Sequence, residues 1–316
     1  MADRGDNNFM RYVYRGEEGE IIPREATHIT VHEDCTSVRA NAFLDHQSIV
    51  EIICHDKVEK IEIRAFFGCT SLRRVIMPGV KIVEEAAFEN CHSLSDVECN
   101  MLEIIKEFAF SGCIRSLNSI DLPSARIVEE YAFDECTALA NVKFGSKLER
   151  IEGKVFCHCE SLERVTLPLK DNLITTDDIF AGCRDFSHVD LVEGGAQETI
   201  AALQLDEWRK EMNEEIDSIN QILHNAGFSR YNDDNYAERK ARAIRRWIRS
   251  VLRKINHYKA EHERILDEAE TSLQLVLSHD ILTINILPFL KLPSYTFEAV
   301  QDHEMGQEDS DDEEEE

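Results

Sequence analysis

Phenylalanine recurs between residues 43 and 180 at a nearly constant spacing of 22 to 24 residues. A small or aliphatic residue stands directly before each one, and a cysteine stands three residues after six of the seven. In the first copy, Phe43, the position of the cysteine is taken by His46. The six other pairs are Phe66/Cys69, Phe88/Cys91, Phe110/Cys113, Phe133/Cys136, Phe156/Cys159 and Phe180/Cys183. A motif kept in register over seven copies indicates an internal structural repeat.

After each cysteine comes a run with the pattern apolar-x-x-aliphatic-x-apolar, of which Leu72, Val75 and Met77 are one example. The alternation at its end is typical of a short strand whose odd positions face inward. A degenerate copy begins at Ala26, so about eight repeats are expected. One repeat cannot bury its apolar face alone, and stacked repeats build one continuous core. The pattern predicts an α/β repeat solenoid, with a length of about 35 to 40 Å at the usual strand spacing.

The full repeat, Ile-x-x-x-Ala-Phe-x-x-Cys-x-x-Leu-x-x-Val-x-Leu, resembles the BspA-like class of leucine-rich repeats over roughly residues 26–191. The resemblance implies a horseshoe-like leucine-rich-repeat array. It also implies protein binding or cell-surface adhesion, and it does not imply catalysis.

A helical period begins near Ala196, where apolar residues form one stripe as far as Leu223. Asn225-Ala226-Gly227 supplies a helix stop, and Asn235 with Glu238 forms a capping box for a second helix. We expect a first helix of about 28 residues and an antiparallel α-helical hairpin. The predicted domains are an N-terminal cap (1–25), the solenoid (26–192), the hairpin (196–280), a docking segment (281–300) and a disordered acidic tail (301–316).

The net charge of −27 opposes binding to nucleic acid or to anionic membranes. The first eleven residues lack the pattern of a secretory signal, and the longest apolar run, 281–290, is too short to span a bilayer. We therefore expect an intracellular protein, cytoplasmic or nuclear, whose thiols stay reduced. We expect no membrane association, and the sequence does not decide the oligomeric state.

Ten cysteines then need an explanation other than disulfides. The cysteines at the repeat position would stack as a buried ladder whose S–H groups serve loop carbonyls. These are Cys69, Cys91, Cys113, Cys136, Cys159 and Cys183. Zinc binding is the alternative, because Cys157-His158-Cys159 and Cys91-His92 offer metal-binding side chains, but no CxxC pair is present. We expect these cysteines to pack the core rather than bind a metal, and we expect no cofactor. Cys35 and Cys157 do not occupy a repeat position, and the repeat does not explain them.

The outward strand positions would form the concave face of the solenoid. Ile53 beside Ile76 makes a small apolar patch of the kind that anchors a partner. The alternative is that the hairpin, or nothing, covers this face. The candidate partner-binding residues are Ile53, Arg74, Ile76, Glu98, Asp121, Lys143, Arg164 and His188.

A basic stripe runs along the second helix, formed by Arg242, Arg246, Arg249 and Arg253, with Lys240 and Lys254 among the residues that widen it. It would contact nucleic acid or an acidic partner. The alternative, which we favour, is internal pairing with acidic residues of the first helix. These are Glu207, Glu211, Glu214 and Glu215.

No nucleotide-binding loop, nucleophile elbow or metalloprotease motif is present. The sequence therefore predicts a non-enzymatic protein–protein interaction scaffold that binds a protein partner through the solenoid surface. The alternative function is a nucleic-acid-binding or regulatory protein that acts through residues 242–253 of the second helix.

Overall fold

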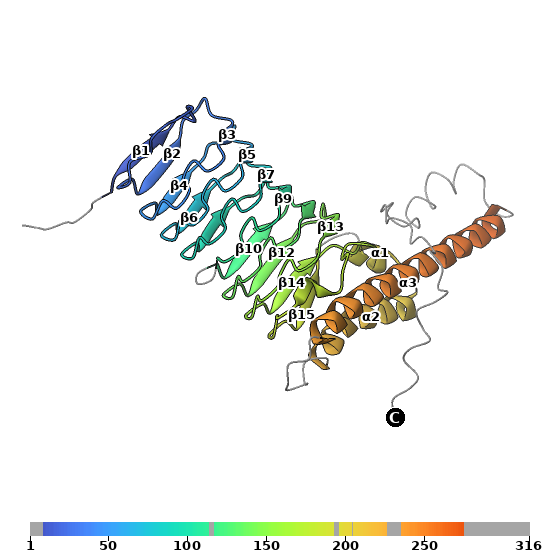
Figure 1. Ribbon diagram of the computed structural model, residues 1–316. Coiled ribbons are helices and arrows are strands. Elements are labelled where there is room, and N and C mark those ends of the chain that lie inside the picture. Colours follow the sequence, from blue (N-terminus) through green and yellow to red (C-terminus); the bar gives the residue numbers. More distant parts are fainter. Residues whose placement is uncertain (1–8, 114–116, 193–195, 204, 226–234, 275–316) are drawn as a thin grey trace, which may run out of the picture. The chain divides into compact units, whose positions relative to one another are not determined.

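Parallel strands stacked one per repeat build the first part of the chain in the computed structural model (Figure 1). The structure describes residues 9–113, 117–192, 196–203, 205–225 and 235–274. These fall into two compact units. One holds the solenoid together with Ile216–Arg246, and the other holds the described parts of Gly194–Glu215 and Trp247–Glu316.

The longer strands of the solenoid form two parallel sheets. The first contains β1 (Arg11–Tyr14), β2 (His28–Val31), β4 (Glu51–Ile53), β6 (Arg74–Ile76) and β8 (Asp96–Glu98). The second contains β10 (Ser119–Leu122), β12 (Asn141–Phe144), β14 (Arg164–Leu167) and β15 (His188–Leu191). We call the surface formed by the outward side chains of these strands the strand face.

Two-residue strands form a third parallel sheet, one strand per repeat. It contains β3 (Ser37–Val38), β5 (Lys60–Ile61), β7 (Ile82–Val83), β9 (Ile104–Ile105), β11 (Ile127–Val128) and β13 (Arg150–Ile151). Each of these strands ends in the aliphatic residue found five positions before the repeat phenylalanine, and that residue is fully buried. The predicted repeat solenoid is therefore confirmed.

The repeat phenylalanines form one continuous stack through the core. From Phe43 to Phe180 the ring centres of successive repeats lie 4.9 to 5.9 Å apart, and the ring planes are within 16° of parallel. None of these rings is more than 1% exposed. The spacing is that of favourable aromatic pairs. Because each repeat contributes one phenylalanine at about the spacing of the stacked strands, the rings fill the core continuously.

The repeat cysteines form a second row beside the phenylalanines. Each thiol donates to the backbone carbonyl of the phenylalanine one repeat earlier, as Cys69 does to Phe43 at 3.0 Å. The other five sulfur–oxygen distances lie between 3.0 and 3.6 Å. In the first copy the imidazole Nε2 of His46 lies 2.9 Å from the carbonyl oxygen of Pro23. The predicted ladder therefore exists, and it consists of hydrogen bonds between neighbouring repeats.

Tight turns on either side of each phenylalanine use the left-handed backbone region. Two residues after the phenylalanine, φ lies between 55° and 76° in all seven copies. The residues there are Asp45, Gly68, Asn90, Gly112, Glu135, His158 and Gly182. Glycine, aspartate and asparagine tolerate this conformation best. Glu135 and His158 are the less usual members.

The helices are α1 (Ala196–Ala202), α2 (Asp206–Asn225) and α3 (Asn235–Gln274), and a short 3₁₀ turn spans Asp178–Phe180. The described part of α2 ends at Asn225 and that of α3 begins at Asn235, the residues named for the predicted stop and start. The single first helix of about 28 residues is wrong, because α1 ends at Ala202 and a new helix begins at Asp206. Most of the N-terminal cap is described, whereas the predicted docking segment and acidic tail lie outside the described residues.

Within the unit of the solenoid, the segment Ile216–Arg246 packs against the last repeats. The side-chain oxygen of Asn220 accepts a hydrogen bond from the Val189 backbone at 2.9 Å. Arg242 and Arg245 both pair with Asp177. This part of the two helices therefore closes the core at the end of the array.

Within the second unit, α2 and α3 are joined by polar contacts around two glutamates. The Glu215 carbonyl accepts from the Trp247 indole at 2.8 Å, and its carboxylate accepts from Lys254 at 2.7 Å. Glu211, one turn earlier on α2, accepts from Tyr258, which lies farther along α3. The helices therefore run antiparallel, as predicted.

Candidate interaction surfaces

One apolar column occupies the strand face over the first sheet. Strand register places Val13, Thr30, Ile53 and Ile76 side by side, and Glu98 continues the column. The side chains of Val13 and Ile53 are 46% and 37% exposed. With the exposed Thr30 and the half-buried Ile76 they form a largely apolar strip across four adjacent strands, which is a common feature of protein interaction sites.

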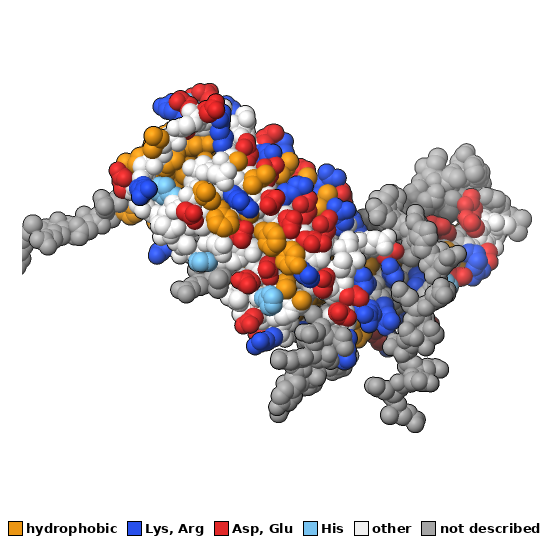
Figure 2. All heavy atoms as spheres, viewed as in Figure 1, with side chains coloured by type: hydrophobic (Ala, Val, Ile, Leu, Met, Phe, Trp, Pro, Cys, Tyr) orange, Lys and Arg blue, Asp and Glu red, His pale blue; other side chains and the backbone are white. Residues whose placement is uncertain are grey.

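A charged cluster borders this strip in the neighbouring column. The guanidinium of Arg74 lies 3.0 Å from Asp96, 2.8 Å from Glu98 and 3.5 Å from Glu51. The hydrogen bond to Glu98 is the main cause that raises the pKa of Arg74. Three carboxylates around one cation leave local negative charge beside the apolar strip. Figure 2 shows acidic, basic and hydrophobic side chains interspersed along the repeats.

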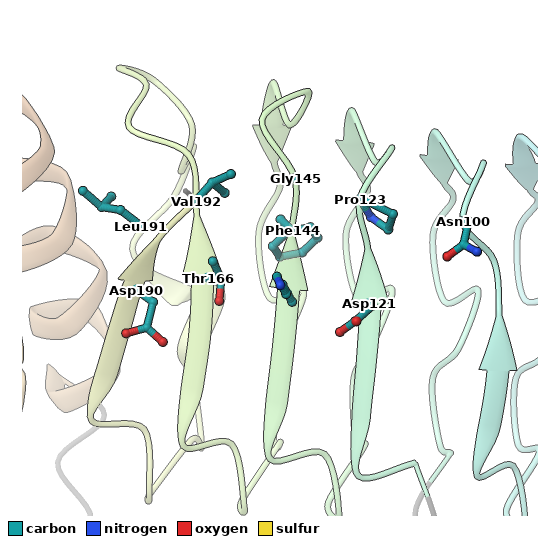
Figure 3. Close-up of a pocket in the computed structure, with 10 residues that line it drawn as sticks. Asn100, Asp121, Pro123, Phe144, Gly145, Thr166, Asp190, Leu191 and Val192 are labelled. Carbon is teal, nitrogen blue, oxygen red and sulfur yellow. The ribbon is translucent and has the colours of Figure 1, made fainter. Parts of the chain in front are cut away.

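The second sheet carries a different surface. Asp121, Lys143, Thr166 and Asp190 form its central column, and they line an open hollow of about 560 Å³ (Figure 3). Arg164 pairs with Asp190 at 2.6 Å. The side chain of Lys143 is exposed. This hollow therefore offers one exposed ammonium group flanked by a carboxylate and a hydroxyl.

The structure places all eight predicted partner-binding residues on the strand face. They fall on two sheets, with Ile53, Ile76, Arg74 and Glu98 on the first. The other four lie on the second sheet and are Asp121, Lys143, Arg164 and His188. That these residues bind a partner stays a prediction.

Strand β1 adds residues that the sequence analysis missed. It lies in the segment predicted as a cap, and it pairs with β2 residue for residue, which puts Val13 on the strand face. Phe9 packs edge-on against His28 at 4.9 Å and is 59% exposed. The segment lacks the Phe/Cys repeat. The run of the strand-favouring residues Tyr12, Val13 and Tyr14 was the available signal.

The arginine stripe lies exposed along α3. Arg242 pairs with Asp177 at 3.2 Å, and Arg246, Arg249 and Arg253 are also exposed. The sequence analysis favoured acidic residues of the first helix as partners of this stripe. Of these acidic residues, Glu211 and Glu215 pair with Lys254, which is one of the lysines that widen the stripe.

Three side chains converge on the turn side of the fifth and sixth full repeats. The Cys157 sulfur lies 3.2 Å from His158 Nδ1, and this nitrogen lies 3.3 Å from a carboxylate oxygen of Asp134. Burial, followed by the charge and hydrogen bond of Asp134, raises the pKa of Cys157 to about 11. A thiol that keeps its proton at neutral pH is a poor nucleophile.

The thiols of the core are equally unsuited to nucleophilic chemistry. Burial raises the pKa of Cys54, Cys69 and Cys99 to about 12. Cys183 is shifted in the same direction by burial, although Lys240 opposes the shift in its pKa. These groups serve as neutral donors in packing.

The family described as "BspA type Leucine rich repeat region" matches residues 24–126 and 103–200, which together are more than half of the chain. The chain belongs to this family. The BspA-type repeats thus cover the strand face from β2 to β15 and the cysteine ladder.

Solved structures similar to these BspA-type repeats come from several bacteria. A leucine-rich repeat protein of T. pallidum is 21% identical, covers 58% of this chain and 70% of its own, and has a TM-score of 0.37. One from Bacteroides ovatus is 22% identical, covers 54% and 61%, and has a TM-score of 0.34. The pneumococcal vaccine antigen PcpA is 14% identical, covers 54% and 42%, and has a TM-score of 0.36. The chain therefore spans less than two thirds of the last two. No protein with a curated description matches.

BspA-type repeat proteins are generally scaffolds for protein interaction or surface adhesion and are typically non-enzymatic. In the described part of the chain, no helix is both long enough and apolar enough to cross a membrane.

Proposed function

We propose that this BspA-type protein is a non-enzymatic scaffold that binds a protein partner on the strand face. The observation that carries the proposal is the strip formed in register on four adjacent strands by Val13, Thr30, Ile53 and Ile76, in which Val13 and Ile53 are exposed and Ile76 is half-buried. The fold places these side chains outward, and the core does not use them. Their exposure therefore has no role in building the solenoid.

The surroundings of the strip match the usual anatomy of an interface. Binding energy concentrates in a few central apolar or aromatic residues, and a polar rim excludes water and sets specificity. Phe9 packs against His28, two residues from Thr30 on β2, and the cluster of Arg74 with Glu51, Asp96 and Glu98 borders the strip. The acidic rim favours a partner with an apolar segment next to basic residues.

A pair of substitutions tests the proposal. Ile53→Asp with Ile76→Asp puts two carboxylates into the strip, and Ile63→Asp is the matched control. Ile63 is 42% exposed, close to the 37% of Ile53, and it lies next to the short strand β5, away from the strand face. Each protein is used as bait in its native organism, and bound proteins are quantified after crosslinking.

We expect the wild type and Ile63→Asp to recover the same partners. The amount recovered should be at least about tenfold lower with the double variant, because a charge in a desolvated interface centre costs several kcal/mol. Thermal unfolding checks that all three proteins are folded. Equal recovery by the double variant and the control would contradict a binding site on the strip.

An intracellular location is part of the same proposal. All ten cysteines are free and buried, and the repeat cysteines need a free thiol for their hydrogen bonds. Reducing compartments preserve such thiols. Fractionation of the native organism, with the protein followed by an antibody, tests this; recovery from the culture medium or the cell surface would contradict it.

A second candidate function is nucleic-acid binding or regulation through α3, and the exposure of Arg246, Arg249 and Arg253 favours it. The net charge of −27 opposes it. Binding to mixed-sequence DNA and RNA is measured across a salt series with the wild type and with Arg246→Glu plus Arg253→Glu. We expect weak binding; submicromolar affinity that falls steeply with salt and is lost in the variant would favour this function.

A further inference from the structure

We propose that Asp134, Cys157 and His158 bind one divalent transition-metal ion of the zinc type. The three donor atoms are a carboxylate oxygen, a sulfur and the imidazole Nδ1, and all lie within 4.8 Å of one another. This site is separate from the strand face. The proposal replaces, for these residues alone, the expectation from the sequence that no metal is bound.

The distances between the donor atoms fit a tetrahedral ion. Nδ1 of His158 lies 3.2 Å from the Cys157 sulfur and 3.3 Å from Oδ1 of Asp134. Ligands placed about 2.0 to 2.3 Å from zinc at tetrahedral angles are separated by roughly 3.3 to 3.8 Å. Small rotations of these side chains would therefore complete the coordination. Three protein ligands leave a fourth position for water.

The stacking of repeats creates this convergence. Asp134 and Cys157 occupy the same position in adjacent repeats, directly after Phe133 and Phe156, and His158 follows Cys157 in the chain. The Glu135 backbone donates to the Cys157 carbonyl at 2.9 Å, which fixes the two turns against each other. Two ligands thus come from one turn and the third from its neighbour.

The repeat fold does not require a cysteine at this position. The other copies have Leu44, Phe67, Glu89, Ser111, Asp134 and Ala181 directly after the phenylalanine. Cys157 is also not part of the cysteine ladder, because Cys159 makes the ladder hydrogen bond of the same repeat. Its thiol therefore points at a carboxylate and an imidazole for a reason other than packing.

The backbone and the next repeat hold His158 in place. Its amide donates to the Ala181 carbonyl at 2.7 Å, and its φ is 55°. Gly182 of the following turn leaves room for the histidine, because a Cβ at Gly182 would lie 3.0 Å from the His158 Cα and 3.1 Å from its ring carbon. The ring is thus confined on one side before any ion binds, which favours affinity.

Access and charge are also suitable. The His158 side chain is 62% exposed and Asp134 is 18% exposed, so an ion can enter from solvent, while Cys157 is buried. The charge of Lys154 acts on Cys157, and the Lys154 ammonium donates to the Tyr131 hydroxyl at 2.8 Å and lies 5.2 Å from the centre of that ring. Asp178 adds a further negative charge nearby. A carboxylate, a thiolate and an imidazole suit a borderline-soft ion such as zinc.

Cobalt titration tests the site. Co²⁺ replaces zinc in tetrahedral sites, and a bound thiolate gives an intense sulfur-to-cobalt absorption in the near ultraviolet. The full-length protein is stripped with a chelator and titrated with Co²⁺ and, separately, with Zn²⁺. We expect one ion per chain and a thiolate band that is absent in Cys157→Ser.

The variants Asp134→Asn and His158→Asn test the other two ligands, and asparagine tolerates the left-handed backbone of residue 158. Each should bind Co²⁺ at least about tenfold more weakly than the wild type. Cys35→Ser is the matched control, because Cys35 is equally buried and lies far along the array, near Tyr14. Its band and affinity should be unchanged.

Zinc should also raise the unfolding temperature of the wild type and of Cys35→Ser but not that of His158→Asn, because an ion that binds only the folded state stabilises it. A wild type without a thiolate band at saturating Co²⁺ would overturn the proposal. A band that persists in Cys157→Ser would overturn it as well, since another thiol would then be the ligand.

Discussion

The buried ammonium of Lys240 donates a hydrogen bond to the backbone carbonyl of Phe186 and lies 5.5 Å from the centre of the Phe186 ring. The carbonyl of Cys183 lies 3.4 Å from the same nitrogen. Lys240 is fully buried. A residue of α3 therefore satisfies carbonyl groups of the last repeat, for which the array offers no following repeat.

The first prediction concerns the pH dependence of this contact. Burial lowers the pKa of Lys240 from 10.5 to about 8, although Cys183 and Asp185 oppose the shift. Between these values the unfolded chain binds the proton more strongly, so stability rises with pH. The shift corresponds to about 3 kcal/mol. Relative to Lys240→Met, the wild type should gain about this much unfolding free energy from about pH 7 to about pH 11.

Urea unfolding of both proteins measures this difference, and the comparison cancels the titration of thiols and tyrosines common to both. Parallel stability curves for the wild type and Lys240→Met would contradict a buried, titrating lysine.

A second prediction tests the phenylalanine stack. Phe110 lies between Phe88 and Phe133, with ring centres 5.2 and 5.4 Å away. Phe110→Ala should lower the free energy of unfolding by about 3 to 5 kcal/mol, because it removes a buried ring and leaves a cavity. Phe9→Ala, at a ring that is 59% exposed, is the control and should change stability little. Similar losses in the two variants would be incompatible with a stacked core.

A third prediction concerns thiol reactivity. The repeat cysteines are at most 2% exposed, and burial raises the pKa of Cys69 to about 12. A thiol-labelling reagent at neutral pH should therefore modify them only after denaturant is added. Cys35 and Cys157, each 7% exposed, should react first. Rapid labelling of six or more thiols in the native protein would rule out the ladder.

A fourth prediction addresses the contact between Glu215 and Lys254. Burial opposes the charge on Glu215, but hydrogen bonds from Lys254 and Ser250 outweigh it and lower the pKa of Glu215. The contribution of this carboxylate is therefore present above about pH 4.5 and is lost as pH falls through the lowered pKa. A double-mutant cycle with Glu215→Gln and Lys254→Met should give a coupling of about 0.5 to 1 kcal/mol at neutral pH.

Thermal unfolding of the four proteins provides this coupling. The same cycle with Glu215→Gln and Arg253→Met is the comparison, since Arg253 is an exposed residue of the same helix turn. A coupling energy that stays constant as the pH falls through the lowered pKa of Glu215 would argue against the ion pair. A coupling energy equal to that of the Arg253 cycle would do so as well.

The repeats could be predicted because each core position is occupied in the same way many times. A single pair such as Phe110 and Cys113 predicts no fold, but seven copies at one spacing predict a stacked array. The strand-face residues followed from the same register, because outward positions alternate with inward ones. The sequence register therefore predicted correctly that Ile53 and Ile76 are neighbours.

Features that occur once were harder to predict. Lys240 was placed among the residues that widen the basic stripe, but the structure buries it against the last repeat. Helical spacing predicts on which face of a helix a residue lies, but it does not predict which neighbour covers that face. The contact between Cys157 and Asp134 depends on stacking across 23 residues, and spacing alone did not single out the pair. Strand β1 and the break between α1 and α2 likewise carry no repeated signal.

The two ends of the solenoid differ in a way that limits self-association. At β15 the Val189 amide, which would donate to a carbonyl of a following strand, already donates to the side-chain oxygen of Asn220 of α2. At the opposite end, β1 pairs with β2 on one side, and its other edge faces no strand of the described chain. Exposed edges are templates for strand addition. Head-to-tail growth into a fibre would require β15 of one copy to receive β1 of the next, and α2 blocks that step. Blocking one end is enough to keep a repeat array finite.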